Sequence, residues 1–183
     1  LLVLSFAMLL GFGFTLLSPP GSSWRQVWLP VLGMVLFWLA AVAIIAAVLQ
    51  PEPTLLVAQA DALARYSLGI PAALLGAWAL MTQQRTFREA NMPQFGRDLI
   101  WATTALLLFG VIGQLFVRET PLVPSNMLNS ALFLQWFGIP VQLFRGLTAI
   151  VMLIFMIRSL KAFDVESQRR LEAANQARLK HGN

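Results

Sequence analysis

Apolar residues in this chain fall in five long blocks separated by short polar breaks, a pattern typical of membrane proteins. The blocks cover residues 1–17, 27–49, 66–81, 99–117 and 139–157. None carries the polar stripe of period 3.6 that marks a surface helix of a soluble protein. A helix of about 17–25 apolar residues can cross a bilayer. The sequence therefore predicts an all-α integral membrane protein, built as a bundle of about five transmembrane helices.

The breaks between the blocks set the expected helix ends. The second block ends at "QPEP", where the prolines stop a helix. The third helix can begin as early as Thr54, because the residues that follow are good helix formers and Asp61 stands four residues before Arg65. We expect one transmembrane bundle over residues 1–157 and a cytoplasmic helical linker over residues 158–183.

Composition supports a membrane protein and excludes several kinds of chemistry. Of 183 residues, 58% are hydrophobic and 11% are charged, and the mean hydropathy is +0.71. The chain has no Cys, and its one His, His181, lies near the end, which excludes Cys-ligated metals and a bis-histidine haem within the bilayer. No carboxylate lies within the predicted spans, so a proton relay lacks its usual groups. We expect no metal, no cofactor and no catalytic residue.

Cations in the short loops predict the orientation. Lys and Arg are enriched on the cytoplasmic side of membrane proteins. The cations of the two most basic segments are Arg85, Arg88, Arg97, Arg158, Lys161, Arg169, Arg170, Arg178 and Lys180. The C-terminus is then cytoplasmic, and residues 50–65 and 118–137 lie outside. This distribution serves topology and does not form a groove for nucleic acid. Alternation places Leu1 outside, so we expect a further helix upstream.

The outer segment 118–137 predicts a short helix at the membrane surface. Pro121 and Pro124 keep its beginning extended, and Ser125 or Asn126 can cap the helix. The apolar surface that follows should lie on the headgroup layer or fold back over the bundle. Two interpretations remain open, an interfacial anchor and a lid over an outward-facing pocket.

Arg145 interrupts the last apolar block, five residues after Pro140. That spacing places it roughly 7 Å along the helix, near the outer surface. One interpretation is that Arg145 snorkels outward or bonds the carbonyls freed around Pro140. The other is an outer-half polar pocket for a small anionic or lipid-like ligand. The candidate ligand-binding residues of that pocket are Arg65, Gln114, Asn129, Gln142 and Arg145.

The segment after the last block predicts a helix that continues from the bilayer. It has no Pro and no Gly before Gly182, and Glu166 stands four residues before Arg170. Heptad spacing gives an imperfect apolar seam, which is compatible with a marginal helix pair between two copies of the chain. A solvated helical tail is the alternative. The candidate signal-transmission residues are Arg158, Leu160, Phe163 and Leu171.

Four segments of the chain resemble a known family. They are "ARYSLGIPAALLGAWAL" at 64–80, "PSNMLN" at 124–129, "FGIPVQLFRGL" at 137–147 and "RSLKAFDVESQRRLEAA" at 158–174. In this order they resemble the multi-span N-terminal sensor region of certain bacterial sensor histidine kinases. The resemblance implies a bacterial inner (cytoplasmic) membrane and a last helix that leads toward dimerisation and kinase domains. The departure is that the 183 residues contain no phospho-acceptor box and no Gly-rich ATP-binding motif, so we expect no kinase activity in this chain.

Two functions therefore remain open. The first is a membrane-embedded sensor and signal-transmission module of a two-component system. The second is a non-catalytic accessory or structural transmembrane subunit of a larger membrane complex. The expected partners are the lipid bilayer, a second copy of the chain or a larger complex, and a small anionic or lipid-like ligand. An in-frame kinase region after residue 183 would favour the first function, and a stop codon there would favour the second.

Overall fold

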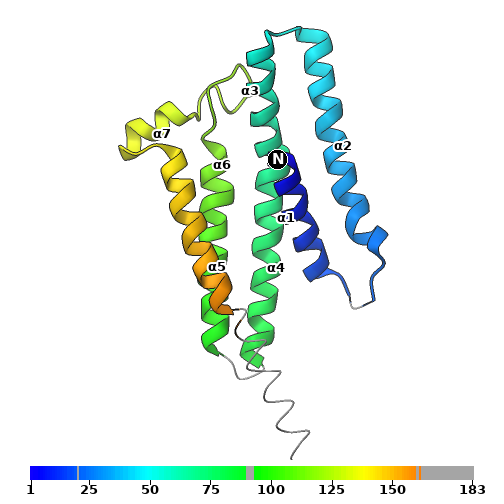
Figure 1. Ribbon diagram of the computed structural model, residues 1–183, viewed down its shortest axis with the longest axis vertical. Coiled ribbons are helices and arrows are strands. Elements are labelled where there is room, and N and C mark those ends of the chain that lie inside the picture. Colours follow the sequence, from blue (N-terminus) through cyan, green and yellow to red (C-terminus); the bar gives the residue numbers. More distant parts are fainter. Residues whose placement is uncertain (20, 90–92, 160, 162–183) are drawn as a thin grey trace, which may run out of the picture.

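The described part of the chain is all helical, which confirms the all-α part of the predicted fold class (Figure 1). A computed structural model describes residues 1–19, 21–89, 93–159 and 161. Its elements are α1 (Leu2–Leu17), α2 (Trp24–Leu49), α3 (Pro53–Ala64), η1 (Arg65–Gly69), α4 (Ile70–Glu89), α5 (Pro93–Leu107), η2 (Leu108–Ile112), α6 (Gly113–Leu115) and α7 (Ser130–Phe137). A last helix, Val141–Ser159, follows and is coloured orange in Figure 1. No strand occurs within these described ranges.

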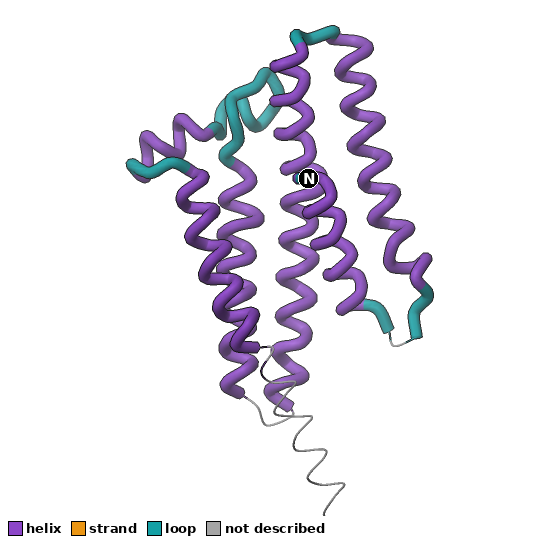
Figure 2. The backbone as a smooth tube through the Cα atoms, viewed as in Figure 1, coloured by secondary structure: helices purple, strands orange, loops and turns teal. Residues whose placement is uncertain are grey.

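Several of these elements join into longer helices. The segments α3, η1 and α4 form one continuous helix, drawn as an unbroken purple coil in Figure 2. Its start at Pro53 agrees with the early start expected near Thr54. The segments α5, η2 and α6 form the next helix in the same way. In both helices a five-residue π segment, η1 or η2, interrupts the α-helical hydrogen bonding.

Four helices in the described residues are long and apolar enough to cross a membrane. They are Trp24–Leu49, Pro53–Arg85, Gly96–Leu115 and Val141–Ser159. The first predicted span corresponds to α1, which is apolar but has 16 residues. At 1.5 Å per residue α1 is about 24 Å long, shorter than the roughly 30 Å hydrocarbon core of a bilayer. The five predicted blocks are therefore four long helices and one short helix.

The helix that contains α4 lies at the centre of the bundle. It packs against α5 and α1, and α2 packs on the outside against α1 and α3. Small buried residues such as Ala72, Ala73 and Ala102 line these contacts and let the helices approach closely. At Gly110 an added Cβ would overlap the Cβ of Ala73, so only glycine fits this approach.

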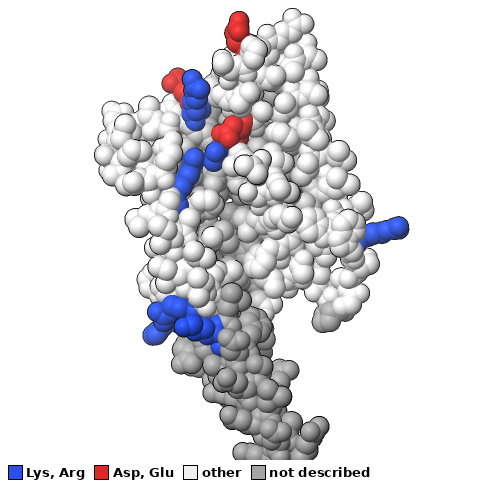
Figure 3. All heavy atoms as spheres, viewed as in Figure 1, with Lys and Arg blue, Asp and Glu red and all other residues white. Residues whose placement is uncertain are grey.

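The outer helices expose most of their apolar surface. In the most apolar 18-residue window of each helix, the buried share is 6% in α2 and 11% in the last helix. The corresponding share is 50% in each of the two central helices. Most charged side chains on the face in Figure 3 lie toward the two ends of the bundle, and one basic side chain projects from the right edge between them. This arrangement suits a helix bundle with lipid on its outer faces.

Candidate functional site

The predicted third and fourth helices meet at a polar cluster around Arg65. The Arg65 guanidinium donates from Nε to Oδ2 of Asp61 at 2.8 Å and from Nη2 to Oδ1 at 3.2 Å. Its Nη1 donates to Oε1 of Gln114 at 2.6 Å, which joins the two helices. Gln114 is 1% exposed, so this contact is shielded from solvent. Bidentate pairing with a carboxylate fixes the orientation of the guanidinium plane.

Arg145 extends from the last helix to the end of the fourth. Its Nε donates to the carbonyl of Gly113 at 2.6 Å, and its Nη2 donates to the carbonyl of Phe116 at 2.9 Å. These carbonyls lie in the last turn of the helix formed by α5, η2 and α6. The last turn of a helix leaves carbonyl acceptors without intrahelical partners and favours a cation. The structure therefore places the hydrogen bonds of Arg145 on carbonyls of the fourth helix and not on carbonyls around Pro140.

Both arginines line one cavity of about 320 Å³. This size is at the lower end of the roughly 300–1,000 Å³ typical of small-molecule pockets, and an apolar lining with a few polar groups is also typical of them. The lining residues come from α1, η1, η2, α6 and the last helix: Leu2, Ser5, Phe6, Leu9, Arg65, Gly69, Phe109, Gly110, Gln114 and Arg145. We refer to this space as the arginine cavity.

Both π segments border the arginine cavity. The segment η1 contributes Arg65 and Gly69, and η2 contributes Phe109 and Gly110. A π segment adds one residue to a helical turn, which redirects the side chains around it and is frequent at functional sites. Nε2 of Gln114 donates to the carbonyl of Phe109 in η2 at 3.5 Å, a long contact. The two interruptions therefore both lie at the wall of the arginine cavity.

The two arginines differ in how their charge is balanced. Arg65 forms an ion pair with Asp61. Arg145 forms no ion pair with any carboxylate in the described parts of the chain, and its observed partners are two backbone carbonyls. A partly buried cation is stabilised by a counter-charge, and carbonyl dipoles supply only part of this. The arginine cavity therefore has an unbalanced positive charge on its Arg145 side.

Two of the predicted pocket residues lie outside the cavity lining. Asn129 is the N-cap of α7, and its Oδ1 accepts the backbone N–H of Leu132 at 3.0 Å. Asn129 therefore occupies the cap position expected for Ser125 or Asn126. Gln142 is exposed and makes no side-chain hydrogen bond to the described residues. The structure brings Arg65, Gln114 and Arg145 together and separates the other two.

The short helix α7 packs on the end of the bundle beside the cavity. Phe133 of α7 is 1% exposed and lies against Phe116 at 5.0 Å and Phe144 at 5.5 Å between ring centroids. No residue of α7 lines the arginine cavity, and Figure 1 shows α7 projecting sideways from the bundle. The packing therefore fits an anchor on the last helix, and it does not place α7 as a lid over this cavity.

A second polar contact joins the last helix to the fourth at the opposite end. Nε of Arg158 donates to Oδ2 of Asp98 at 3.2 Å, and the guanidinium lies 5.7 Å from the ring centroid of Phe155. Asp98 is buried, whereas the Arg158 side chain is 55% exposed. Sequence reasoning selected Arg158 but missed Asp98. The other predicted transmission residues, Leu160, Phe163 and Leu171, lie outside the described residues.

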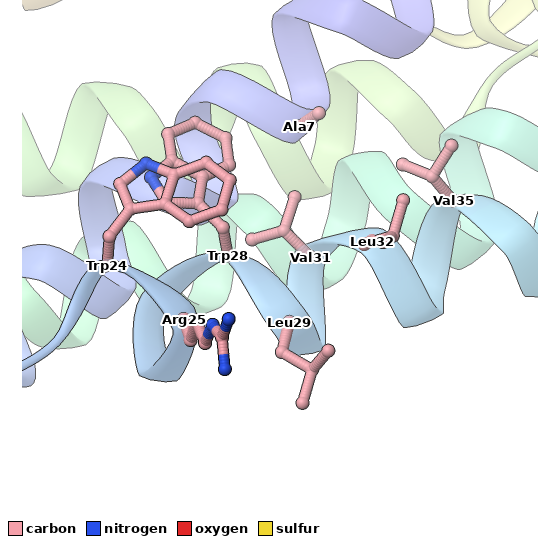
Figure 4. Close-up of a pocket in the computed structure, with 8 residues that line it drawn as sticks. All are labelled: Ala7, Trp24, Arg25, Trp28, Leu29, Val31, Leu32 and Val35. Carbon is pink, nitrogen blue, oxygen red and sulfur yellow. The ribbon is translucent and has the colours of Figure 1, made fainter.

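A separate apolar groove lies between α1 and α2. It has a volume of about 280 Å³ and is lined by Ala7, Trp24, Arg25, Trp28, Leu29, Val31, Leu32 and Val35. The rings of Trp24 and Trp28 stack with their centroids 6.0 Å apart, and Arg25 points away from them (Figure 4). Because Arg25 is exposed, it provides a control arginine that lies outside the arginine cavity.

No protein-family model, curated protein or solved structure matches this chain. The resemblance to the sensor region of histidine kinases therefore depends on the four sequence segments alone. The assignment of a function depends on the arginine contacts and the cavity between them.

Proposed function

We propose that this chain is a membrane-embedded sensor and signal-transmission module, similar to the sensor region of bacterial histidine kinases and without catalytic activity of its own. One observation carries the proposal. An arginine at each end joins the last helix to the fourth helix, and the outer of these, Arg145, also lines the cavity. A change in the cavity therefore acts directly on the helix that leads to the predicted linker.

Only 11% of the most apolar window of the last helix is buried, which makes its position sensitive to these arginines. Met152 and Met156 pack against the buried core of α4 and α5, and Phe144 packs near α7. Within a bilayer the hydrophobic effect adds little to helix association, so packing and interhelical hydrogen bonds decide it. A coupling of about 1–3 kcal/mol between two sites changes an equilibrium roughly 5–150-fold. The hydrogen bonds of Arg145 are in that range, at about 1.5–3 kcal/mol for charged groups.

Transmission requires a ligand that binds two arrangements of the last helix unequally. In one arrangement Arg145 holds the carbonyls of Gly113 and Phe116. In the other, Arg145 bonds the occupant of the cavity and releases the end of the fourth helix. The pair between Arg158 and Asp98 then serves as the pivot at the inner end of the last helix.

The exposed face of α2 favours the second candidate function, an accessory subunit of a larger membrane complex. A partner helix could cover this apolar face as well as lipid does. The coding sequence after residue 183 separates the two functions. An in-frame kinase region supports the sensor, and an immediate stop codon supports the accessory subunit.

Disulfide cross-linking in membranes tests the sensor directly, and the absence of native Cys from the 183 residues removes any background. We expect cysteines placed at Leu160 and Leu171 to cross-link between two copies of the chain. Arg145→Gln should change the yield of these cross-links, because it releases the outer end of the last helix. Arg25→Gln is the matched control and should leave the yield unchanged. No cross-link at either position, or equal yields with Arg145→Gln, would contradict transmission through this helix.

A further inference from the structure

We infer that the arginine cavity binds the acidic headgroup of a single-chain amphiphile, a carboxylate or a phosphate monoester with an alkyl chain attached. The inference rests on the proposed sensor function, because it names the ligand class of that same site. Three features of the cavity carry it: the unbalanced charge, the unused donors and the apolar walls.

The donors of the cavity favour an anion. A guanidinium has five N–H groups in a planar fork. Arg65 directs three of its bonds to Asp61 and Gln114, whereas Arg145 makes two bonds to carbonyls and has no hydrogen bond from Nη1 to the described residues. Charge-assisted bonds to a carboxylate or phosphate are roughly twice as strong as neutral ones. An anionic oxygen at Arg145 therefore supplies the counter-charge that the described residues do not.

The walls of the cavity favour an alkyl chain attached to that anion. Leu2, Phe6 and Leu9 of α1 and Phe109 of η2 line it together with the arginines. A small hydrated anion alone would leave the cavity-facing surface of these side chains in contact with water, whereas an alkyl chain removes apolar surface from water on both sides. An apolar lining around a few oriented donors is the usual composition of such sites.

Anion binding would also compete with the helix end. The carbonyls of Gly113 and Phe116 are neutral acceptors, and an acidic headgroup is a stronger acceptor for the same Arg145 donors. A bound headgroup therefore draws Arg145 toward the cavity and weakens its contact with the fourth helix. This gives the ligand the unequal affinity for two arrangements that transmission requires.

Binding is tested with the full chain reconstituted in phosphatidylcholine vesicles, with radiolabelled dodecyl phosphate as the probe. We expect saturable binding that unlabelled dodecyl phosphate and dodecanoate displace, and that dodecanol and inorganic phosphate displace at least about tenfold less effectively. Arg145→Gln should weaken binding by about tenfold or more, which is the range of a charge-assisted hydrogen bond. Arg25→Gln should have no effect, because Arg25 lies outside the cavity.

A second variant keeps the test decisive if Arg145→Gln fails to fold. Ser5 is exposed at the cavity wall, so Ser5→Trp fills the space without removing either arginine. We expect Ser5→Trp to abolish probe binding while the chain unfolds at the same temperature as the parent. Unchanged binding in Ser5→Trp would overturn the assignment to this cavity.

The competing ligands test whether the site needs both an anion and an alkyl chain. The cross-linking result distinguishes failure of the ligand class from failure of the sensor function. Equal displacement by dodecanol would overturn the need for an anion, and equal displacement by inorganic phosphate would overturn the need for an alkyl chain. Equal weakening by Arg25→Gln would indicate binding outside the arginine cavity, at surface charge or in the groove between α1 and α2, and overturn the site. If dodecyl phosphate fails to bind while Arg145→Gln still alters cross-linking at Leu160 and Leu171, the ligand class is wrong and the sensor function stands.

Discussion

At the scale of single residues, Arg145 is suited to its position because a planar guanidinium can reach two acceptors at once. The carbonyls of Gly113 and Phe116 are three residues apart at a helix end, and two different nitrogens of Arg145 bond them. A lysine carries a point charge on a flexible stem and lacks this fixed fork. At Gly113 an added Cβ would lie 3.1 Å from Cγ of Arg145, so the backbone also leaves little space beside the guanidinium stem.

Replacement of Arg145 should therefore destabilise the protein measurably. We expect Arg145→Gln to lower the free energy of unfolding in detergent micelles by about 1–3 kcal/mol, because two partly buried carbonyls lose a charged donor. Arg145→Lys should lie between Arg145→Gln and the parent. Arg25→Gln should change the free energy by less than about 0.5 kcal/mol, as is usual for surface positions. Equal effects of the two Gln substitutions would contradict the role assigned to Arg145.

Three residues of the arginine cavity were predicted from the sequence, but Gln142 and Asn129 were assigned to it wrongly. Depth along each helix selected Arg65, Gln114 and Arg145, because polar residues in apolar helices tend to face one another. Depth alone does not settle which face of a helix a side chain occupies, and Gln142 is exposed. The side chain of Asn129 bonds its own backbone neighbourhood, a local alternative that its residue type allows and that depth does not reveal.

At the scale of elements, two π segments, η1 and η2, lie in the long helices where these helices border the arginine cavity. The sequences of η1, "RYSLG", and η2, "LFGVI", carry no motif that predicts a π turn. The apolar blocks predicted both helices but not the extra residue in each. The two helices approach closely at Gly110 and Ala73.

Gly110→Ala should separate these two helices. The added Cβ would overlap the Cβ of Ala73, and such overpacking costs typically about 1–3 kcal/mol. We expect a lower unfolding temperature in micelles. Gly33 of α2 has open space around its Cβ position, so Gly33→Ala is the matched control and should be neutral or stabilise by up to about 1 kcal/mol. A neutral Gly110→Ala would contradict the close helix contact.

The two arginine contacts of the last helix should act independently on stability. Arg145 and Arg158 are separated by 13 residues, roughly 20 Å along a helix, and they share no partner. We expect Asp98→Asn to release Arg158, and its effect to add to that of Arg145→Gln within about 0.5 kcal/mol. Unfolding measurements on the two single variants and the double variant check this. A coupling larger than about 1 kcal/mol would contradict two separate contacts.

At the scale of the whole molecule, the long apolar blocks were enough to predict an all-helical bundle, but not its packing order. Composition and block length do not specify which helix is central, and the structure places α4 there and α2 outside. The short length of α1 was visible in the sequence. Its role as a wall of the arginine cavity was not, because Leu2, Phe6 and Leu9 resemble any apolar helix face.

The orientation of the bundle is tested by cysteine labelling in intact bacterial cells. The cations near Arg85 and Arg97 predict a cytoplasmic side, and Glu119 lies at the opposite end of the fourth helix. We expect a membrane-impermeant maleimide to label a cysteine at Glu119 from outside, and a cysteine at Gln84 only after permeabilisation. Labelling of the cysteine at Gln84 from outside would contradict the predicted orientation.

Arg145, in the proposed function, couples the cavity to the position of the last helix. Spin labels at Leu29 of α2 and Leu143 of the last helix, both exposed, report by double electron–electron resonance the position of the end of the last helix that carries Arg145. In lipid vesicles we expect one main distance in the parent and in Arg25→Gln. We expect a shifted or clearly broadened distribution in Arg145→Gln, since a loss of about 1–3 kcal/mol changes a population roughly 5–150-fold. An identical distribution in Arg145→Gln would contradict the coupling.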